Sequence, residues 1–213
     1  MKFDELIEIV ADEPVFETGV LLAGAVDPAD ARRQLSRWVK AGRLWQFRRG
    51  LYALAAPFQK VAPHPFVIAN RLLTGSYVSC QSALAHYGLI PESAPLTISV
   101  SVHRHRRWDT PAGSFEFHVL KRELMFGYQL VALGQGQSAF VARPEKALLD
   151  LIYLTPGADS RAWLAELRLQ HVEQLDLTAL QQMAGRSAKP RLIRAAALVA
   201  AVVQSEAAAY EAL

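Results

Sequence analysis

Apolar residues recur at helical spacing at the start of the chain, and acidic residues occupy the rest of each turn. The apolar positions are Phe3, Leu6, Ile7 and Val10. This pattern predicts a short amphipathic helix that ends before Pro14. A second short helix is expected over residues 17–23, with Val20 and Leu21 pointing inward.

A third predicted helix has the clearest boundaries in the chain. Asp27 is suited to accept backbone N–H bonds as the N-cap, and Pro28 fits the first helical position. Gly42 provides a left-handed exit. The apolar side of this helix comprises Ala31, Leu35, Trp38 and Val39. Successive residues of a helix are rotated by about 100° around its axis. This rotation places five polar residues on the opposite side: Arg32, Arg33, Ser36, Arg37 and Lys40. One face can therefore pack on the first two helices while the other offers cations to a partner.

Two short β-prone runs, residues 44–47 and 51–54, follow the third helix and predict a hairpin. Gly50 supplies the positive φ that such a turn often requires, and Arg48 and Arg49 are expected at its tip. Three helices followed by a hairpin, with cations on both, is the layout of a winged helix-turn-helix domain, whose third helix enters the major groove. A winged domain used for protein contact is the alternative. DNA is favoured because both sets of cations face one surface.

A proline-containing stretch, residues 57–65, predicts a domain boundary. The expected division is a winged helix-turn-helix DNA-binding domain over 1–60 and a mixed α/β domain over 61–213, to which the resemblance described below adds an antitoxin role. In the second domain the pattern predicts strands at 77–79, 96–102, 114–120, 128–133 and 139–142. It predicts helices at 66–73, 81–87 and 144–154, and from 160 to the end. The expected fold class is α+β, a winged helix-turn-helix domain followed by a mixed α/β domain with a small sheet and a helical C-terminus.

The distribution of charge is more informative than the net charge of +3. No acidic residue stands between Asp30 and Glu92, and such a basic stretch attracts phosphate backbones. A solvated basic face is the alternative. The hydrophobic fraction of 52% is that of a folded protein, and no window resembles a membrane span. Acidic residues soon after Met1 also exclude a signal peptide, so we expect a cytoplasmic protein without membrane contact.

The segment His103-Arg104-His105-Arg106-Arg107 is the most prominent polar feature of the second domain. Alternation along a strand places its two histidines on one side, an arrangement that a metal requires. Because no cysteine is adjacent and Asp109 is the only nearby carboxylate, we expect no metal site. The segment is instead interpreted as a basic loop that binds DNA phosphates or an acidic partner surface through Arg104, Arg106 and Arg107. A solvated loop is the alternative.

Catalytic residue types do not form a recognisable active-site pattern. Lys146 and Asp150 lie one helical turn apart, so an (i, i+4) ion pair at a helix start, with the lysine in solvent, explains both. Cys80, the only cysteine, stands in an apolar context typical of a small buried residue. No G-x-S-x-G elbow, Walker loop or dinucleotide fingerprint is present. We therefore expect no enzyme activity, no catalytic residues and no cofactor.

Several segments, in this order and spacing, resemble the AbiEi-type antitoxins, a family of viral-defence transcriptional regulators. They are Phe16 with the following helices, the hairpin at 48–53, and the segments 82–91, 96–100 and 143–150. The resemblance runs from about residue 3 to residue 154. It implies a type IV toxin–antitoxin role, in which the first domain represses its own operon at inverted repeats in the promoter. The second domain then counters a nucleotidyltransferase-like toxin. A solitary winged-helix regulator and a DNA-targeted enzyme such as a nuclease are the alternatives.

Overall fold

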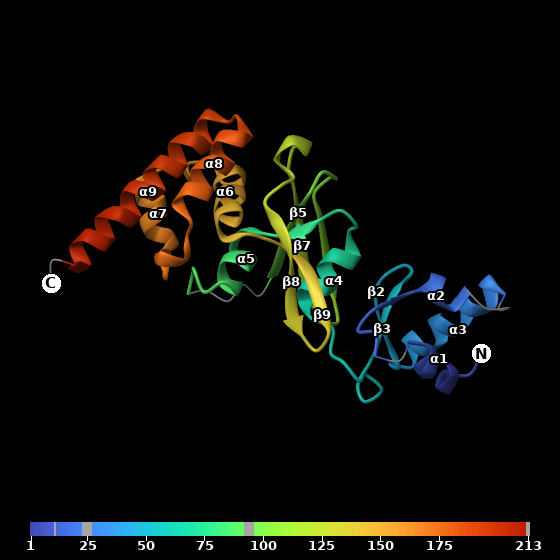
Figure 1. Cartoon of the computed structure of the whole chain (residues 1–213). Coiled ribbons are helices and arrows are strands. Elements are labelled where there is room, and N and C mark those ends of the chain that lie inside the picture. The colour runs from blue at the N-terminus through green and yellow to red at the C-terminus, as the bar shows by residue number, and fades with distance from the viewer. Residues whose placement is uncertain (11, 23–26, 92–95, 212–213) are drawn as a thin grey trace.

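The computed structural model describes residues 1–10, 12–22, 27–91 and 96–211 of the chain. Figure 1 shows three parts in a row: the N-terminal helices with a hairpin, a central sheet, and a group of C-terminal helices. Helices α1 and α9 lie at opposite ends of the molecule (Figure 1). The fold is mixed α+β, as the sequence predicts.

The first part, residues 1–54, is called the N-terminal unit. Its elements are α1 (Phe3–Val10), β1 (Phe16–Glu17), α2 (Thr18–Leu22), α3 (Pro28–Lys40), β2 (Leu44–Arg48) and β3 (Leu51–Leu54). The strands form an antiparallel sheet in the order β1-β3-β2. Leu6, Leu35 and Leu44 are buried in the core that the helices and this sheet enclose. The hairpin turn uses Gly50 at a φ of +86°, as expected for the left-handed conformation.

The boundaries predicted for α3 are confirmed. The Asp27 carboxylate accepts hydrogen bonds from the backbone N–H groups of Ala29 (2.8 Å) and Asp30 (3.0 Å), and Pro28 is the first helical residue. Gly42 follows the helix with a φ of +69°. These contacts satisfy N–H groups that a helix start leaves without partners.

The prediction for the second helix is wrong in two respects. Helix α2 begins at Thr18, because Glu17 pairs with Leu51 in the sheet instead. Leu21 is buried as expected, but Val20 is 49% exposed, since a helix this short presents only one side to the core. The expected last residue, Ala23, lies outside the described residues.

The second part contains a six-stranded sheet in the order β6-β7-β5-β4-β9-β8 among the described residues. Its strands are β4 (Tyr77–Val78), β5 (Leu96–Ser101), β6 (Arg106–Thr110), β7 (Gly113–Val119), β8 (Tyr128–Gly134) and β9 (Gln137–Ala142). Strand β5 is parallel to β7, and β4 is parallel to β9. Helix α4 (Pro65–Leu72) lies on the side facing the N-terminal unit, and α5 (Cys80–His86) lies on the other (Figure 1). Short 3-10 turns follow at Arg122–Leu124 and Val172–Gln174.

Strand β6 corrects the prediction of a basic loop at residues 103–107. Arg106 and Arg107 belong to this strand, which pairs with β7 so that Arg107 lies opposite Glu116. The sheet is consequently larger than expected. The strand was missed because it is an edge strand in which Trp108 is the only large apolar residue, and charged side chains are normal at a sheet edge.

The C-terminal part consists of α6 (Pro144–Leu154), α7 (Arg161–Leu167), α8 (Leu177–Ser187) and α9 (Pro190–Glu211). Helix α6 begins and ends as predicted and packs against α5, α8 and α9, which joins the helical part to the sheet. Within the described ranges, no helix combines the length and apolar character needed to cross a membrane.

The N-terminal unit and the second part share an apolar contact. Residues 55–64, where the sequence predicts a domain boundary, contain no helix or strand. However, Val15, Phe47, Leu51 and Ala53 are buried in the same cluster as the sheet and its helices. One side of the β2–β3 hairpin therefore packs on the second part, and the predicted domains are in apolar contact.

Candidate nucleic-acid interface

The polar face of α3 is the largest predicted site that the structure keeps open to solvent. Its exposed side chains are Arg32, Arg33, Ser36, Arg37 and Lys40. They are exposed because Ala31 and Leu35, on the opposite side of the helix, are completely buried. The 3.6-residue period thus separates a packed face from a cationic face.

Two arginines of this face differ in their contacts. The Arg33 guanidinium forms an ion pair with Asp30, one turn earlier, and this contact lowers the pKa of the Asp30 carboxyl. Arg37 forms no ion pair within the described residues. Its guanidinium is therefore available to a ligand without first leaving a carboxylate.

The arginines of the hairpin also differ, and here the prediction needs correction. Arg48 is half-buried: its guanidinium donates a hydrogen bond to the Arg71 carbonyl (3.1 Å) and lies 3.5 Å from the Glu17 carboxylate. Since Arg71 is in the last turn of α4, the cation meets the negative end of that helix. Arg48 thus connects the N-terminal unit to the second part, whereas Arg49 is exposed at the turn.

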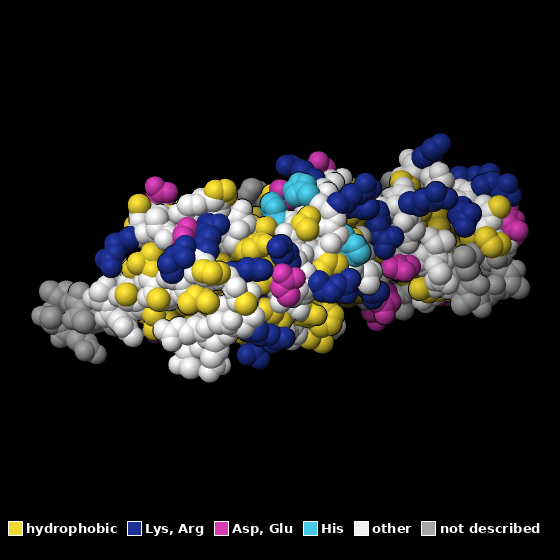
Figure 2. Space-filling model, turned by 90° about the horizontal axis from the view of Figure 1, so that it is seen from above, with side chains coloured by type: hydrophobic (Ala, Val, Ile, Leu, Met, Phe, Trp, Pro, Cys, Tyr) yellow, Lys and Arg dark blue, Asp and Glu magenta, His cyan; other side chains and the backbone are white. Residues whose placement is uncertain are grey.

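The basic segment of the second part lies beside the hairpin, because β2 and β6 adjoin. Arg104, Arg106 and Arg107 are all exposed. The Arg106 guanidinium stacks over the Trp108 ring at 5.5 Å. Figure 2 shows one face of the molecule on which Lys and Arg side chains gather over both the N-terminal unit and the adjoining part of the sheet. The two predicted basic sites therefore lie in neighbouring parts of the structure.

Comparison with protein-family models and with curated protein sequences found no match to this chain.

Cys80 is buried, as predicted. Burial raises the pKa of its thiol, and the neighbouring Asp150 carboxylate raises it further. Because the thiolate is the reactive form, this cysteine is unsuited to nucleophilic catalysis.

The predicted ion pair between Lys146 and Asp150 is confirmed, but its place in the molecule is not as expected. Both side chains are buried, so the prediction that Lys146 lies in solvent is wrong. Asp150 also accepts hydrogen bonds from the hydroxyls of Tyr77 (3.0 Å) and Ser79 (2.7 Å). The Lys146 ammonium stacks over the Phe126 ring at 5.2 Å. This group of residues ties α6 to the sheet.

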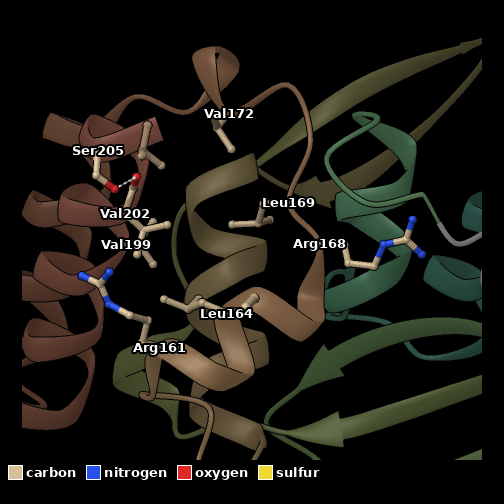
Figure 3. A pocket seen from close by; sticks show the side chains of 10 residues that line it. Arg161, Leu164, Arg168, Leu169, Val172, Val199, Val202 and Ser205 are labelled. Atoms are coloured by element: carbon tan, nitrogen blue, oxygen red, sulfur yellow. Dashed lines mark hydrogen bonds between the residues drawn. The ribbon is translucent and has the colours of Figure 1, made fainter. Parts of the chain in front are cut away.

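A pocket of about 280 Å³ lies between α7 and α9. Leu169 points toward Val199 and Val202 of α9, whereas Arg168 points away (Figure 3). Among the lining residues that the structure describes there is no carboxylate, histidine or cysteine. The Ser205 hydroxyl lines the pocket, but it donates a hydrogen bond to the Val202 carbonyl (2.8 Å), and none of the described lining side chains could act as its general base.

Proposed function

We propose that this protein is a DNA-binding transcriptional repressor whose N-terminal unit is a winged helix-turn-helix domain. The order α1-β1-α2-α3-β2-β3, with a hairpin after the third helix, supports this assignment. The observation that carries it is the exposed cationic face of α3, opposite a side that is buried in the core. The function needs no catalytic step and no cofactor.

In the proposed complex α3 enters the major groove, which is about 12 Å wide and admits a helix. Arg37 and Arg33 then face base edges, and Arg32 and Lys40 contact phosphates on either side. Arg49 reaches the flanking backbone from the hairpin turn. The basic side chains of β6, a strand that adjoins β2 of the hairpin, extend the contact along the duplex.

The test uses fluorescence anisotropy to measure the affinity of the full-length protein for the DNA that precedes its own coding sequence. The measurement is repeated at several salt concentrations. Affinity should fall with a slope of about 0.9 log units per log unit of salt for each phosphate contact. The triple variant Arg32→Ala, Arg37→Ala and Lys40→Ala should bind more weakly and with a flatter slope.

A matched control removes the same charge elsewhere. Lys121, Arg122 and Arg161 are exposed and lie outside the N-terminal unit. Replacing these three by alanine lowers the net charge equally, but it should leave affinity and slope nearly unchanged. If the control variant loses as much as the α3 variant, binding follows overall charge and the winged-helix assignment fails.

The resemblance to AbiEi-type antitoxins supports a second proposed activity. We propose that the second part counters a nucleotidyltransferase-like toxin, with Arg104, Arg106 and Arg107 as contact residues. All three side chains are exposed. Arg106 and Arg107 belong to the edge strand β6 and Arg104 lies just before it, where a partner with an acidic surface can approach.

Rescue of cells that express a co-transcribed nucleotidyltransferase-like toxin checks this second activity. The full-length protein should restore growth, and alanine substitution at Arg104, Arg106 and Arg107 should reduce the rescue. The α3 triple variant should still rescue when expressed from an independent promoter. Absence of rescue by the unchanged protein would leave a solitary regulator as the function.

A further inference from the structure

The outward face of strand β7 carries two potential metal ligands. Phe115 and Phe117 of this strand are buried in the core. Because side chains alternate along a strand, Glu116 and His118 point together to the other face. Both are partly exposed there.

The pairing of β6 with β7 brings a third ligand to the same place. Arg106 lies opposite Phe117, so the preceding residue, His105, arrives beside His118, with ring centroids 5.3 Å apart. His105 Nε2 is 2.8 Å from Glu116 Oε1, and His118 Nε2 is 3.5 Å from the same oxygen. One donor atom from each residue lies within 4.8 Å of the other two.

We propose that His105, Glu116 and His118 bind a zinc ion. Zinc takes histidine nitrogen and carboxylate oxygen at about 2.0–2.2 Å in tetrahedral geometry, and two histidines with one glutamate is an established ligand set. Ligand atoms around such an ion are about 3.3 Å apart. The two histidine Nε2 atoms lie at similar distances, 2.8 and 3.5 Å, from Glu116 Oε1. A water completes the fourth position, since the cluster opens to solvent.

The arginine nearest to Glu116 in the sheet leaves this ligand available. Arg107, which lies opposite Glu116 in the pairing, has its guanidinium 3.5 Å from Asp109 instead. His103, which the alternation argument places beside His105, is absent from the cluster.

The ion links the start of β6 to the middle of β7. It also changes the local charge: the carboxylate and two neutral histidines carry −1, and the added Zn²⁺ gives +1. This charge lies on the face of the sheet to which Arg107, opposite Glu116 in the pairing, also belongs, so occupancy strengthens the attraction of this surface for anions. Metal binding itself does not depend on the proposed function.

The test uses the full-length protein after chelator treatment and gel filtration, titrated with zinc chloride in a calorimeter. We expect one site per chain and a rise in the thermal unfolding temperature that EDTA reverses. His105→Ala and His118→Ala should each weaken binding by more than about tenfold, because even changes to residues behind the ligands cost that much. Glu116→Gln should weaken it as well.

His103→Ala is the matched control, because His103 is an exposed histidine two residues from His105. This variant should bind zinc like the unchanged protein. Unfolding without zinc shows whether each variant is folded. The proposal is overturned if the protein binds no zinc, if the His105 and His118 variants bind normally, or if His103→Ala loses as much affinity as they do.

Discussion

Replacing Lys146 by methionine should lower the free energy of unfolding by about 3–5 kcal/mol, the usual result of removing one partner from a buried ion pair. The change leaves the Asp150 carboxylate buried with only the hydroxyls of Tyr77 and Ser79 as partners. Urea unfolding followed by circular dichroism measures the loss. It should be largest near neutral pH.

The dependence on pH follows from the direction of the pKa shift. Burial raises the pKa of Asp150 in the folded protein, and loss of the ammonium raises it further. A carboxyl group whose pKa is higher in the folded than in the unfolded protein contributes stability when the pH is below its unfolded pKa. This contribution is lost as the pH rises through its pKa in the folded protein. The Lys146→Met variant should therefore approach the stability of the unchanged protein as the pH falls.

Two further variants separate charge from packing. Lys146→Met with Asp150→Asn removes both charges but keeps an acceptor for the two hydroxyls, so it should be more stable than Lys146→Met alone. Lys189→Met breaks a pair with Glu123 at the surface (3.3 Å) and should destabilise the protein much less, because solvent screens an exposed pair. Equal losses in Lys146→Met and Lys189→Met are incompatible with a buried pair.

Sequence reasoning succeeded where one local pattern determines the structure. The boundaries of α3 follow from a capping aspartate, a proline at the first position and a glycine at the exit, all within 16 residues. Helix α6 begins at Pro144 and ends at Leu154, as predicted. In α3 the capping aspartate and the apolar period indicate the same element, and in α6 the proline at the first position and the apolar residues that follow do so.

It failed where the outcome depends on residues distant in the chain. Arg48 is held by the Arg71 carbonyl, 23 positions later, and no local pattern reveals that contact. The sequence does not predict the burial of Lys146, because the aromatic rings beside its ammonium, Tyr77 and Phe126, come from distant segments of the chain. His105 meets His118 only through the register of β6, a strand that the sequence did not predict.

Arg37→Ala should weaken binding to the operator by about 1–3 kcal/mol more than binding to unrelated duplex, the range for an arginine that reads a guanine edge. This corresponds to a loss of discrimination of about 5- to 150-fold. Anisotropy titrations with the operator and with a scrambled duplex of equal length measure both affinities. Equal losses on the two duplexes mean that Arg37 contacts phosphate only.

Asp30 provides a sharper test of the same face. It holds the Arg33 guanidinium in an exposed ion pair, which Arg33 must leave before it contacts DNA. Arg33→Ala should therefore cost less affinity than Arg37→Ala.

Asp30→Asn removes a negative charge and releases Arg33. It should therefore increase affinity for both duplexes, most clearly at low salt where screening is weak. In the Arg33→Ala variant, Asp30→Asn should increase the affinity by less. There it only removes the repulsion between the Asp30 carboxylate and the DNA phosphates, because no arginine is released. If Asp30→Asn lowers affinity in both backgrounds, α3 does not present this face to DNA.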